Sequence, residues 1–544
     1  MFSTAGFLSR IPIQAKLFGF VLVGLFLWST KQAAQLYAYG CDSFGYARQA
    51  QLFREHGLIK GLDTRIQDQN AQQLIDVARL VGGDSKDWQE LVAPLCHHYK
   101  EEVHAVVLQY PPGTGLMLAM FGEPYSLRGL LLLSMAIVAI AVCLPIIAGK
   151  RSTPALIAGA LLFGLIAWTV KQPDAVASYS ITASIGLASL AAMLLHLQQA
   201  GVFSARRQRQ LLAIALGACC GMLVAARLPN AFIVCGVVFV VMFGNSSIFP
   251  IQLCKAWQKV WPFALGFLPV TAWLVLLPNY ISAGGIFLTT YNSIDAAPPV
   301  LSKDVVFEGF RFYYASGFSS PSVVVVTGLL AFGVCQRIFN KSRCESRGLF
   351  SGALIAFVLS LIFFVTHTIR ISYYLLPVCI FALFMLYFEI VAPMQPVPER
   401  LTTKRVVLLV SSVVVLSIAL GAVYRSHKIE LKIPSQVLDS EAVLWSDLTS
   451  GTMYYYAGKY SAKIAYASDC VQDNMIAALA KRGVTQYFVQ DSPVMASLIA
   501  RLKSGAHFED SGEIIADRAY SVQVLHPSAN PDLELKRCNP GAGE

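Results

Sequence analysis

The feature that most constrains this chain is a series of apolar runs, each about as long as a bilayer is thick. A helix needs roughly 20 mostly apolar residues to cross the hydrocarbon core, where only helices and closed barrels satisfy their own backbone hydrogen bonds. Eleven such runs occur: Leu17–Leu36, Gly129–Gly149, Pro154–Val170, Ala175–His196, Leu211–Ala226, Ala231–Phe243, Val260–Ile281, Val323–Cys335, Leu349–His367, Ile371–Ile390 and Val406–Tyr424. We therefore predict a mainly α, polytopic membrane protein with about 11 transmembrane helices.

The composition supports the same class. Hydrophobic residues make up 56% of the 544 residues and charged residues only 14%, whereas soluble domains carry roughly 25% charged residues. The net charge of +10 would suggest nucleic acid as a partner of a soluble chain. Because the basic residues here lie between apolar runs, we attribute them to membrane topology and expect no nucleic-acid partner.

The basic residues all fall on one side of the predicted membrane. The clusters are Arg10 and Lys16; Lys150 and Arg151; Arg206, Arg207 and Arg209; Lys255 and Lys259; Arg337, Lys341, Arg343 and Arg347; and Arg400, Lys404 and Arg405. The positive-inside rule makes this side the cytoplasm. The N-terminus is then cytoplasmic, the chain after Tyr424 is outside, and the first run is an uncleaved anchor.

Two long segments then lie outside the membrane, 40–128 and 425–544, together with a loop at 283–321. The last segment alternates predicted strands (Val443–Trp445, Lys463–Ala467, Thr485–Val489, Tyr520–Leu525) with predicted helices (Met475–Arg482, Val494–Lys503). This alternation predicts a small α/β domain. We therefore expect a transmembrane domain over 1–424, which carries the outer loop 40–128, and a C-terminal extracytoplasmic α/β domain over 425–544.

Asp42 begins the most informative stretch, Cys-Asp-Ser-Phe-Gly-Tyr-Ala, where the first apolar run ends. Tyr46, Ala50 and Phe53 share one face of the helix expected behind it, and this amphipathic helix is expected to lie along the interface. Asp42 is either a helix N-cap or a catalytic carboxylate at the water-lipid boundary. One residue can do both.

Further polar residues recur at the same predicted depth. They are Lys171 and Asp174 after the third run, Arg227 after the fifth, and His367, Arg370, Tyr373 and Tyr374 after the ninth. Charges at a membrane boundary are costly, so a cluster on one face suggests a functional site. Two carboxylates and three cations suit a site that binds an anionic headgroup and abstracts a proton. The alternative is a set of separate interfacial residues with snorkelling side chains.

The segment Tyr110-Pro-Pro-Gly-Thr-Gly-Leu-Met-Leu-Ala-Met-Phe121 is apolar but too short to span a bilayer. We expect a half-helix that enters the interface, with the two prolines fixing its entry. The alternative is a turn that only returns the chain to the membrane.

The outer segments contain an even number of cysteines each. Cys41 and Cys96 lie in the first, and Cys470 and Cys538 in the last. Bonds Cys41–Cys96 and Cys470–Cys538 are therefore compatible with an oxidising compartment. His97, His98 and His104 raise a zinc alternative, but no recognised ligand spacing accompanies them, and we predict no metal site.

Together these motifs resemble the GT-C glycosyltransferases. The resemblance rests on Asp-Ser-Phe-Gly-Tyr-Ala at 42–47, Tyr-Pro-Pro-Gly at 110–113, an acidic residue after the third run, Arg370 with Tyr-Tyr-Leu-Leu-Pro at 373–377, and the outer α/β tail. It covers the whole topology, and it is closest to the bacterial lipid A aminoarabinose transferases and the protein O-mannosyltransferases.

The resemblance implies an enzyme of the bacterial inner membrane with a periplasmic active site. It would move a sugar from a polyprenyl-phosphate carrier to a glycan, lipid or protein acceptor. Asp42 matches the family's catalytic carboxylate and Asp174 its second acidic position, while Tyr110, Arg370 and Tyr374 match substrate-binding positions. We add Tyr46, Lys171 and Arg227 as substrate-binding candidates. Ser43 stands where a second acid would follow Asp42, and a divalent cation stays open as a cofactor.

Two other classes remain as alternatives. A transporter or flippase of lipid-linked sugars would use the same cations, but large outer loops and the lack of an evident inverted repeat disfavour it. A non-catalytic membrane scaffold would bind a partner through its tail and would not need charges gathered at one depth. The sequence names neither the sugar, the acceptor, the lipid length nor the oligomeric state.

Overall fold

The computed structural model describes residues 21–22, 24, 26, 41–82, 88–122, 126–147, 153–170, 179–200, 205–244, 253–291, 298–316, 320–339, 347–390, 431–432, 442–447, 449–464, 467–503, 508–516 and 520–527. The chain divides into two compact units. The first, here called the helical unit, comprises Met1–Leu36, Pro111–Leu276 and Ile294–Ser426. The second, the mixed unit, comprises Tyr37–Tyr110, Leu277–Ser293 and His427–Glu544.

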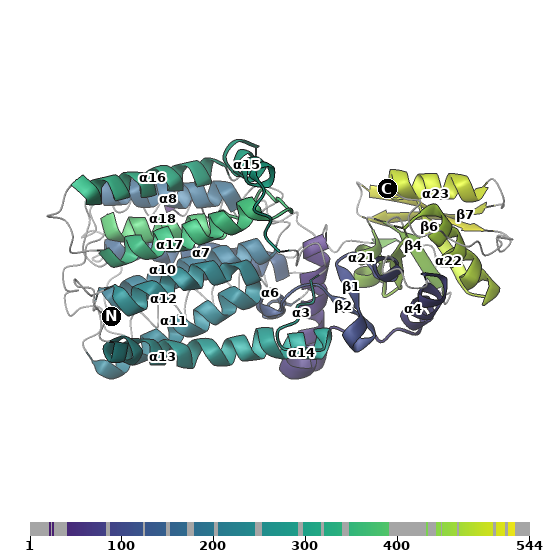
Figure 1. Ribbon diagram of the computed structural model, residues 1–544, viewed down its shortest axis with the longest axis horizontal. Coiled ribbons are helices and arrows are strands. Elements are labelled where there is room, and N and C mark those ends of the chain that lie inside the picture. Colours follow the sequence, from purple (N-terminus) through teal and green to yellow (C-terminus); the bar gives the residue numbers. More distant parts are fainter. Residues whose placement is uncertain are drawn as a thin grey trace, which may run out of the picture. The chain divides into compact units, whose positions relative to one another are not determined.

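The helical unit is a bundle whose long helices run side by side (Figure 1). Its elements are α6 (Gly113–Ala119), α7 (Ser126–Ile147), α8 (Thr153–Val170), α10 (Tyr179–Gln199), α11 (Arg206–Ala226), η3 (Leu228–Asn230), α12 (Ala231–Phe243), α13 (Leu253–Thr271), η4 (Ala272–Leu276), α15 (Lys303–Arg311), η5 (Phe312–Ser316), α16 (Ser320–Phe339), α17 (Arg347–Thr366) and α18 (Leu376–Ile390).

Glycines bring the helix backbones of this bundle into contact. A Cβ added at Gly266 of α13 would lie 1.9 Å from the carbonyl oxygen of Ile214 in α11. One added at Gly217 of α11 would lie 2.0 Å from the carbonyl oxygen of Phe263. Small residues at such crossings allow the close packing that drives association of helices in lipid.

Nine of the eleven predicted runs coincide with helices in the part of the chain that the structure describes. Among the described residues, five helices are long and apolar enough to cross a membrane: Tyr179–Gln199, Arg206–Ala226, Val260–Ala283, Ser320–Ile338 and Gly348–Thr366. Four further apolar helices are shorter: Arg128–Cys143, Leu156–Thr169, Leu228–Phe243 and Leu376–Glu389. The run Leu17–Leu36 is described at four residues only, and Val406–Tyr424 lies outside the described residues.

The tenth run differs from its prediction at its start. The sequence predicts a helix from Ile371, but α18 begins at Leu376. Pro377 is the second residue of α18, and proline fits the first turn of a helix because its missing backbone N–H is not needed there. Arg370 and Tyr374 therefore lie on a non-helical segment that precedes α18.

The mixed unit contains helices and two sheets. Its elements are α3 (Cys41–Lys60), α4 (Gln69–Gly82), α5 (Trp88–Leu91), β1 (His97–Lys100), η2 (Glu101–Val103), β2 (Ala105–Leu108), α14 (Leu277–Ala283), β3 (Leu431–Lys432), β4 (Ala442–Ser446), α21 (Ser450–Thr452), η7 (Met453–Ala457), β5 (Ser461–Lys463), α22 (Asp469–Lys481), β6 (Thr485–Val489), α23 (Pro493–Lys503), β7 (Phe508–Ala516) and β8 (Tyr520–Pro527).

The larger sheet has the strand order β3-β7-β8-β6-β4-β5. Strand β4 pairs in parallel with β5 and with β6, placing Leu444 opposite both Ser461 and Tyr487. Strand β8 is antiparallel to β6 and to β7. The tail therefore combines parallel strands joined through helices with a terminal antiparallel hairpin, and the hairpin partner β7 was not among the strands predicted from the sequence.

One hydrophobic core joins the first outer segment to the tail. Leu74 of α4 and Trp88 of α5 belong to the same buried cluster as Trp445 of β4, Met475 of α22 and Phe488 of β6. The predicted boundary, which assigns 40–128 to the transmembrane domain and starts a separate domain at 425, differs from this arrangement. Residues of α4 and α5 are thus buried against the tail, and the two segments share one apolar core.

Replacing Leu74 by Ala tests this joint core. Leu74 is fully buried, and deleting such a side chain costs about 2–5 kcal/mol. We expect amides of β4 and β6 to exchange hydrogen at least about thirtyfold faster, because their protection depends on the shared core. Leu80→Ala on the same helix, where the residue is 71% exposed, is the control. Unchanged exchange in Leu74→Ala would mean that loop and tail fold separately.

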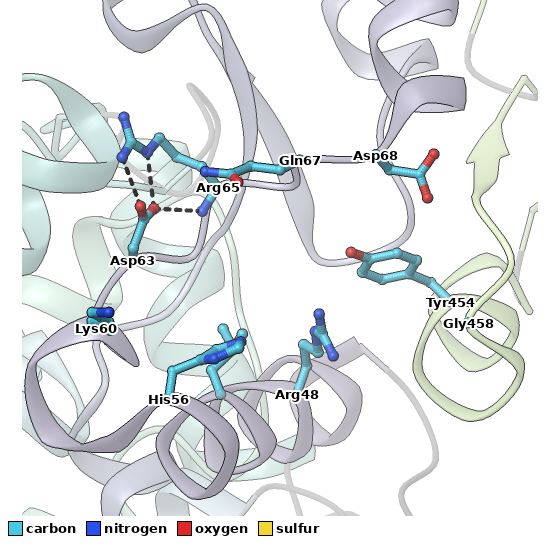
Figure 2. Close-up of a pocket in the computed structure, with 10 residues that line it drawn as sticks. Arg48, His56, Lys60, Asp63, Arg65, Gln67, Asp68, Tyr454 and Gly458 are labelled. Atoms are coloured by element: carbon cyan, nitrogen blue, oxygen red, sulfur yellow. Dashed lines mark hydrogen bonds and ion pairs between the residues drawn. The ribbon is translucent and has the colours of Figure 1, made fainter.

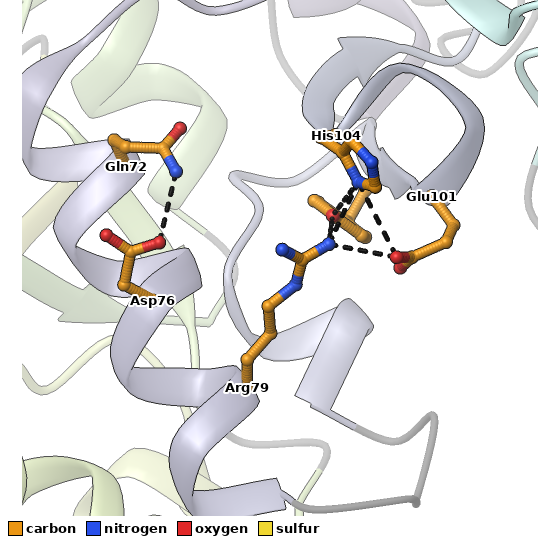
Figure 3. A network of polar contacts seen from close by, with 6 residues as sticks. Gln72, Asp76, Arg79, Glu101 and His104 are labelled. Carbon is orange, nitrogen blue, oxygen red and sulfur yellow. Dashed lines mark hydrogen bonds and ion pairs between the residues drawn. The ribbon is translucent and has the colours of Figure 1, made fainter.

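A polar network ties α4 to the β1–β2 hairpin (Figure 3). Arg79 donates to Glu101 Oε1 at 2.9 Å and to the Tyr99 hydroxyl oxygen. It also lies 2.9 Å from Nδ1 of His104, which adopts a left-handed backbone conformation at φ 47°. The network lies on the surface, so we assign to it the orientation of the hairpin rather than a large share of stability.

His97 of β1 makes the stability of the mixed unit depend on pH. Burial lowers the pKa of this side chain from 6.5 to about 3. Between these values the unfolded chain binds a proton that the folded chain excludes, so stability is full above pH 6.5 and falls with decreasing pH. We expect a loss of about 2 kcal/mol at pH 5.

Thermal unfolding between pH 7.5 and 5 measures this effect. His97→Gln keeps a donor for the carbonyl oxygen of Leu95, which lies 3.1 Å from Nδ1, and removes the titration, so its melting temperature is expected to vary less with pH. His56→Gln, on an exposed histidine, keeps the wild-type dependence. Identical pH profiles for wild type and His97→Gln would contradict the assignment.

Two outer cysteines are oxidised. Cys96 and Cys470 are each disulfide-bonded, as expected for cysteines in an oxidising compartment. Cys538 lies outside the described residues, and the pairings Cys41–Cys96 and Cys470–Cys538 stay predictions.

Candidate functional site

Asp42 lies in the first turn of α3, where it accepts a hydrogen bond from a tyrosine 68 residues later. The hydroxyl of Tyr110 donates to Asp42 Oδ1 at 2.6 Å. A carboxylate in the first helical turn is also favoured by the helix dipole. The two short motifs singled out in the sequence, one at each end of the first outer segment, therefore meet in one hydrogen bond.

The next residues of α3 form a seat for the Tyr110 ring. Tyr46 stacks on it with ring centroids 4.7 Å apart, and Gln49 donates to the Tyr110 carbonyl oxygen at 3.1 Å. Gly45 lies under the ring, where an added Cβ would come within 2.7 Å of a ring carbon. Tyr46 is buried and Tyr291 contacts the Tyr110 ring edge-on. The role of Tyr46 in substrate binding stays a prediction.

The Tyr110 hydroxyl stays protonated. Burial, and after it the negative charge of Asp42, hold the pKa of this phenol well above its usual value of 10.0. A protonated phenol donates, so Tyr110 is the donor in its hydrogen bond with Asp42. Tyr110 thereby fixes the orientation of the Asp42 carboxylate.

In the helical unit, Arg227 lies directly after the last residue of α11 and is largely buried. Its guanidinium carbon lies 3.7 Å from the centre of the Tyr374 ring. Both residues line a cavity of about 10 Å³, room for about one water molecule. Stacking on an aromatic face leaves the planar edge of a guanidinium able to bind phosphate oxygens.

The end of α11 is held by the half-helix α6. Gly113 packs on it so closely that an added Cβ would lie 2.5 Å from the carbonyl carbon of Ala225. The Thr114 hydroxyl donates to the Ala226 carbonyl oxygen at 3.1 Å. On the other side, Asn230 donates to Ser184 Oγ at 2.8 Å and to the Leu223 carbonyl oxygen at 2.9 Å. These contacts position the backbone of Arg227.

The expected half-helix is therefore present and short, from Gly113 to Ala119. The motif Tyr-Pro-Pro-Gly-Thr contributes Tyr110 to the mixed unit and its residues from Pro111 onward to the helical unit.

Arg370 also lies in the helical unit, where α15 supplies its partners. Its Nη1 lies 2.9 Å from Glu308 Oε2, and its Nη2 donates to the Val305 carbonyl oxygen at 3.1 Å. Burial raises the pKa of Tyr313, a fully buried residue of η5, and the positive charges of Arg227 and Arg370 partly oppose this rise. Arg227 and Tyr374 are in contact in this unit, and Arg370 belongs to the same unit. Their assignment to a substrate site stays a prediction.

Lys171 and Asp174 fall outside the described residues, and their assignment stays a prediction. Within the described ranges, no group of three or more His, Cys, Asp or Glu side chains is placed to hold a metal ion.

The chain resembles solved structures in its fold. No family model matches the chain, and no curated protein matches it. The chain is similar to the crystal structure of ArnT from Cupriavidus metallidurans in the apo state, with 13% sequence identity and a TM-score of 0.43. The match covers 88% of this chain and 97% of that chain.

Several residues of the site were not anticipated from the sequence. Glu308 pairs with Arg370 from a predicted outer loop, and Asn230 and Thr114 hold the end of α11. Ser302 is a residue type that favours the N-cap of a helix, and it could have indicated the start of α15. In the structure its hydroxyl accepts a hydrogen bond from the Val305 amide. No sequence signal pairs Glu308 with Arg370, because the two are far apart in the chain.

Proposed function

We propose that this protein is an integral membrane glycosyltransferase of the GT-C kind. It moves a sugar from a polyprenyl-phosphate carrier to an acceptor hydroxyl on the periplasmic face of the bacterial inner membrane, with inversion at the anomeric carbon. The N-terminus is cytoplasmic and residues 425–544 are periplasmic in this proposal.

The observation that carries the proposal is the hydrogen bond from Tyr110 to Asp42. A general base needs a carboxylate held in a fixed orientation. Here the Tyr110 hydroxyl donates to the carboxylate, and Tyr110 is itself held by ring stacking with Tyr46 and by the hydrogen bond from Gln49 to its backbone carbonyl oxygen. An Asp whose only role is to cap a helix does not require a dedicated aromatic seat.

The proposed reaction is a single displacement. The acceptor oxygen attacks the anomeric carbon and its proton passes to the Asp42 carboxylate. The bond between the anomeric carbon and the phosphate oxygen breaks, and the polyprenyl phosphate leaves with the bonding electrons. Attack opposite the leaving group inverts the configuration.

The leaving phosphate gathers negative charge, which fixed cations stabilise. We assign this role first to Arg227, whose guanidinium carbon lies 3.7 Å from the centre of the Tyr374 ring. Arg370 is assigned a supporting role, because Glu308 and the Val305 carbonyl oxygen already occupy part of its donor set. Lys171 and the second acid, Asp174, stay candidates for donor and acceptor contacts, and a divalent cation stays open as a cofactor.

The test follows a radiolabelled sugar carried on a polyprenyl phosphate. Purified protein in proteoliposomes is given this donor and a periplasmic-envelope extract as acceptor. A transferase releases polyprenyl phosphate in a one-to-one ratio with glycosylated acceptor. Movement of the donor between leaflets with its sugar-phosphate bond intact would indicate a flippase instead and would refute the proposal.

A further inference from the structure

The mixed unit contains a polar cavity that the reaction above does not use. It has a volume of about 570 Å³, within the range of about 300–1,000 Å³ that small-molecule sites occupy. Figure 2 shows residues of its wall. Arg48, His56 and Lys60 come from α3 and Tyr454 from η7, and the segment after α3 contributes Asp63, Arg65, Gln67 and Asp68. All these elements belong to the same unit.

The charges on the cavity wall do not cancel. Asp63 accepts from Arg65 Nε at 2.8 Å and from Nη2 at 2.6 Å, so this pair is neutral. Asp68 accepts from the backbone amide of Asn70 at 2.8 Å at the start of α4. Lys60 is exposed and forms no ion pair within the described residues. Arg48 contacts only neutral groups among those the structure identifies, Gln51 Oε1 at 2.8 Å and the Tyr454 ring.

The wall also offers the groups that recognise a sugar. Tyr454 presents an aromatic side chain, over which the Arg48 guanidinium carbon lies 5.4 Å from the ring centre, and Gln67 adds an amide. Aromatic faces stack on the C–H surfaces of a pyranose ring, while amides and charged groups bind its hydroxyls and acidic substituents. A net positive, aromatic-containing cavity therefore suits an anionic sugar better than an apolar ligand.

The cavity lies along the same helix as Asp42. Arg48 lies six residues after Asp42, and His56 lies fourteen residues after Asp42. At a rise of 1.5 Å per residue, these two residues are about 9 Å and about 21 Å from Asp42 along the helix axis. A ligand in the cavity is therefore remote from the reacting hydroxyl. Binding energy from such a remote part can be used to position the reacting group.

We infer that this cavity binds an oligosaccharide that carries a phosphate or a carboxylate, as a remote part of the acceptor. Arg48 and Lys60 bind the acidic group and Tyr454 contacts a sugar ring. That this oligosaccharide is part of the acceptor rests on the proposed function. The binding of an anionic oligosaccharide to the cavity does not depend on it.

Binding is measured by isothermal titration calorimetry on the full-length protein in nanodiscs, without any lipid-linked donor. The probes are trigalacturonate, a maltotriose monophosphate and neutral maltotriose. We expect at least one charged trisaccharide to bind about tenfold or more tightly than maltotriose, because ionised partners roughly double the strength of a hydrogen bond. The tighter of the two charged probes identifies the acidic group.

Substitutions then locate the site. Lys60→Gln changes an exposed residue and should fold normally; Arg48→Gln removes the second cation. Each is expected to weaken binding of the charged trisaccharide about tenfold and leave maltotriose unchanged. Lys481→Gln, an exposed lysine of α22 outside the cavity, is expected to have no effect.

Equal affinity for charged and neutral probes overturns the inference, and so does a loss in Lys481→Gln as large as that in Lys60→Gln. Charged trisaccharide binding that survives in a protein without sugar transfer would keep the cavity assignment and refute only the proposed function.

Discussion

Asp42→Asn is expected to lower the rate of sugar transfer by about 10²- to 10⁴-fold, the range that a positioned general base contributes. Asparagine has nearly the same shape and still accepts a hydrogen bond from Tyr110, which donates to Asp42 Oδ1 at 2.6 Å, but it cannot accept the acceptor's proton. The measurement is initial rate of transfer from the labelled polyprenyl-phosphate donor at equal amounts of folded protein. Donor binding, measured separately, should be retained.

Two variants separate chemistry from structure. Asp76→Asn, at an exposed carboxylate of α4 that accepts from Gln72 at 3.1 Å, controls for loss of one negative charge and should transfer at the wild-type rate. Tyr110→Phe keeps the ring stacked on Tyr46 and removes only the hydroxyl, so a smaller loss is expected, with the pH profile of transfer shifted. Wild-type transfer in Asp42→Asn would leave Asp42 as a helix-terminal residue and place the base elsewhere.

Arg227→Gln is expected to lower the rate by about 10²- to 10³-fold, the cost of removing one preorganised stabiliser of a developing oxyanion. The charge on the leaving phosphate is greatest in the transition state, so the loss should fall on kcat more than on donor binding. Arg227→Lys should recover only part of the rate, because an ammonium cannot match the planar guanidinium that lies 3.7 Å from the Tyr374 ring centre.

Arg207→Gln is the matched control. Arg207 is an exposed arginine in the first turn of the same helix, α11, and its loss should not slow transfer. Because Arg227 is buried, the folded fraction of each variant is checked by size-exclusion chromatography before rates are compared. A loss of donor affinity with kcat unchanged would assign Arg227 to ground-state binding and contradict its role in the transition state.

Much of the fold could be predicted because it depends on local patterns. Apolar runs of membrane length coincide with α7, α8, α10 and the later helices of the bundle, since a helix in lipid must satisfy its own backbone. Most strands and helices of the tail lie where the alternation placed them, such as β6 at Thr485–Val489 and α23 at Pro493–Lys503. The start of α18 was missed because Pro377 overrides apolar continuity.

The site was predicted less completely. Residue types at one expected depth were enough to nominate Asp42, Arg227 and Tyr374, and the family resemblance added Tyr110. Their partners could not be derived in this way. Tyr110 forms hydrogen bonds with residues that are 61 and 68 positions away in the sequence, and Arg370 pairs with Glu308, which is 62 positions away. Hydropathy and spacing carry no information on such pairings, because a side-chain contact depends on how distant segments pack.

Membrane insertion, the approximate ends of most helices and the strand-helix alternation of the tail follow from composition and periodicity, since each depends on neighbours within a few residues. The packing of the first outer segment against the tail does not follow from such local patterns. Leu74 and Trp88 share a core with Trp445 and Phe488, although more than 350 residues separate them. Apolar burial is non-directional and takes whichever surface the folded chain brings near, so this partnership was decided by packing alone.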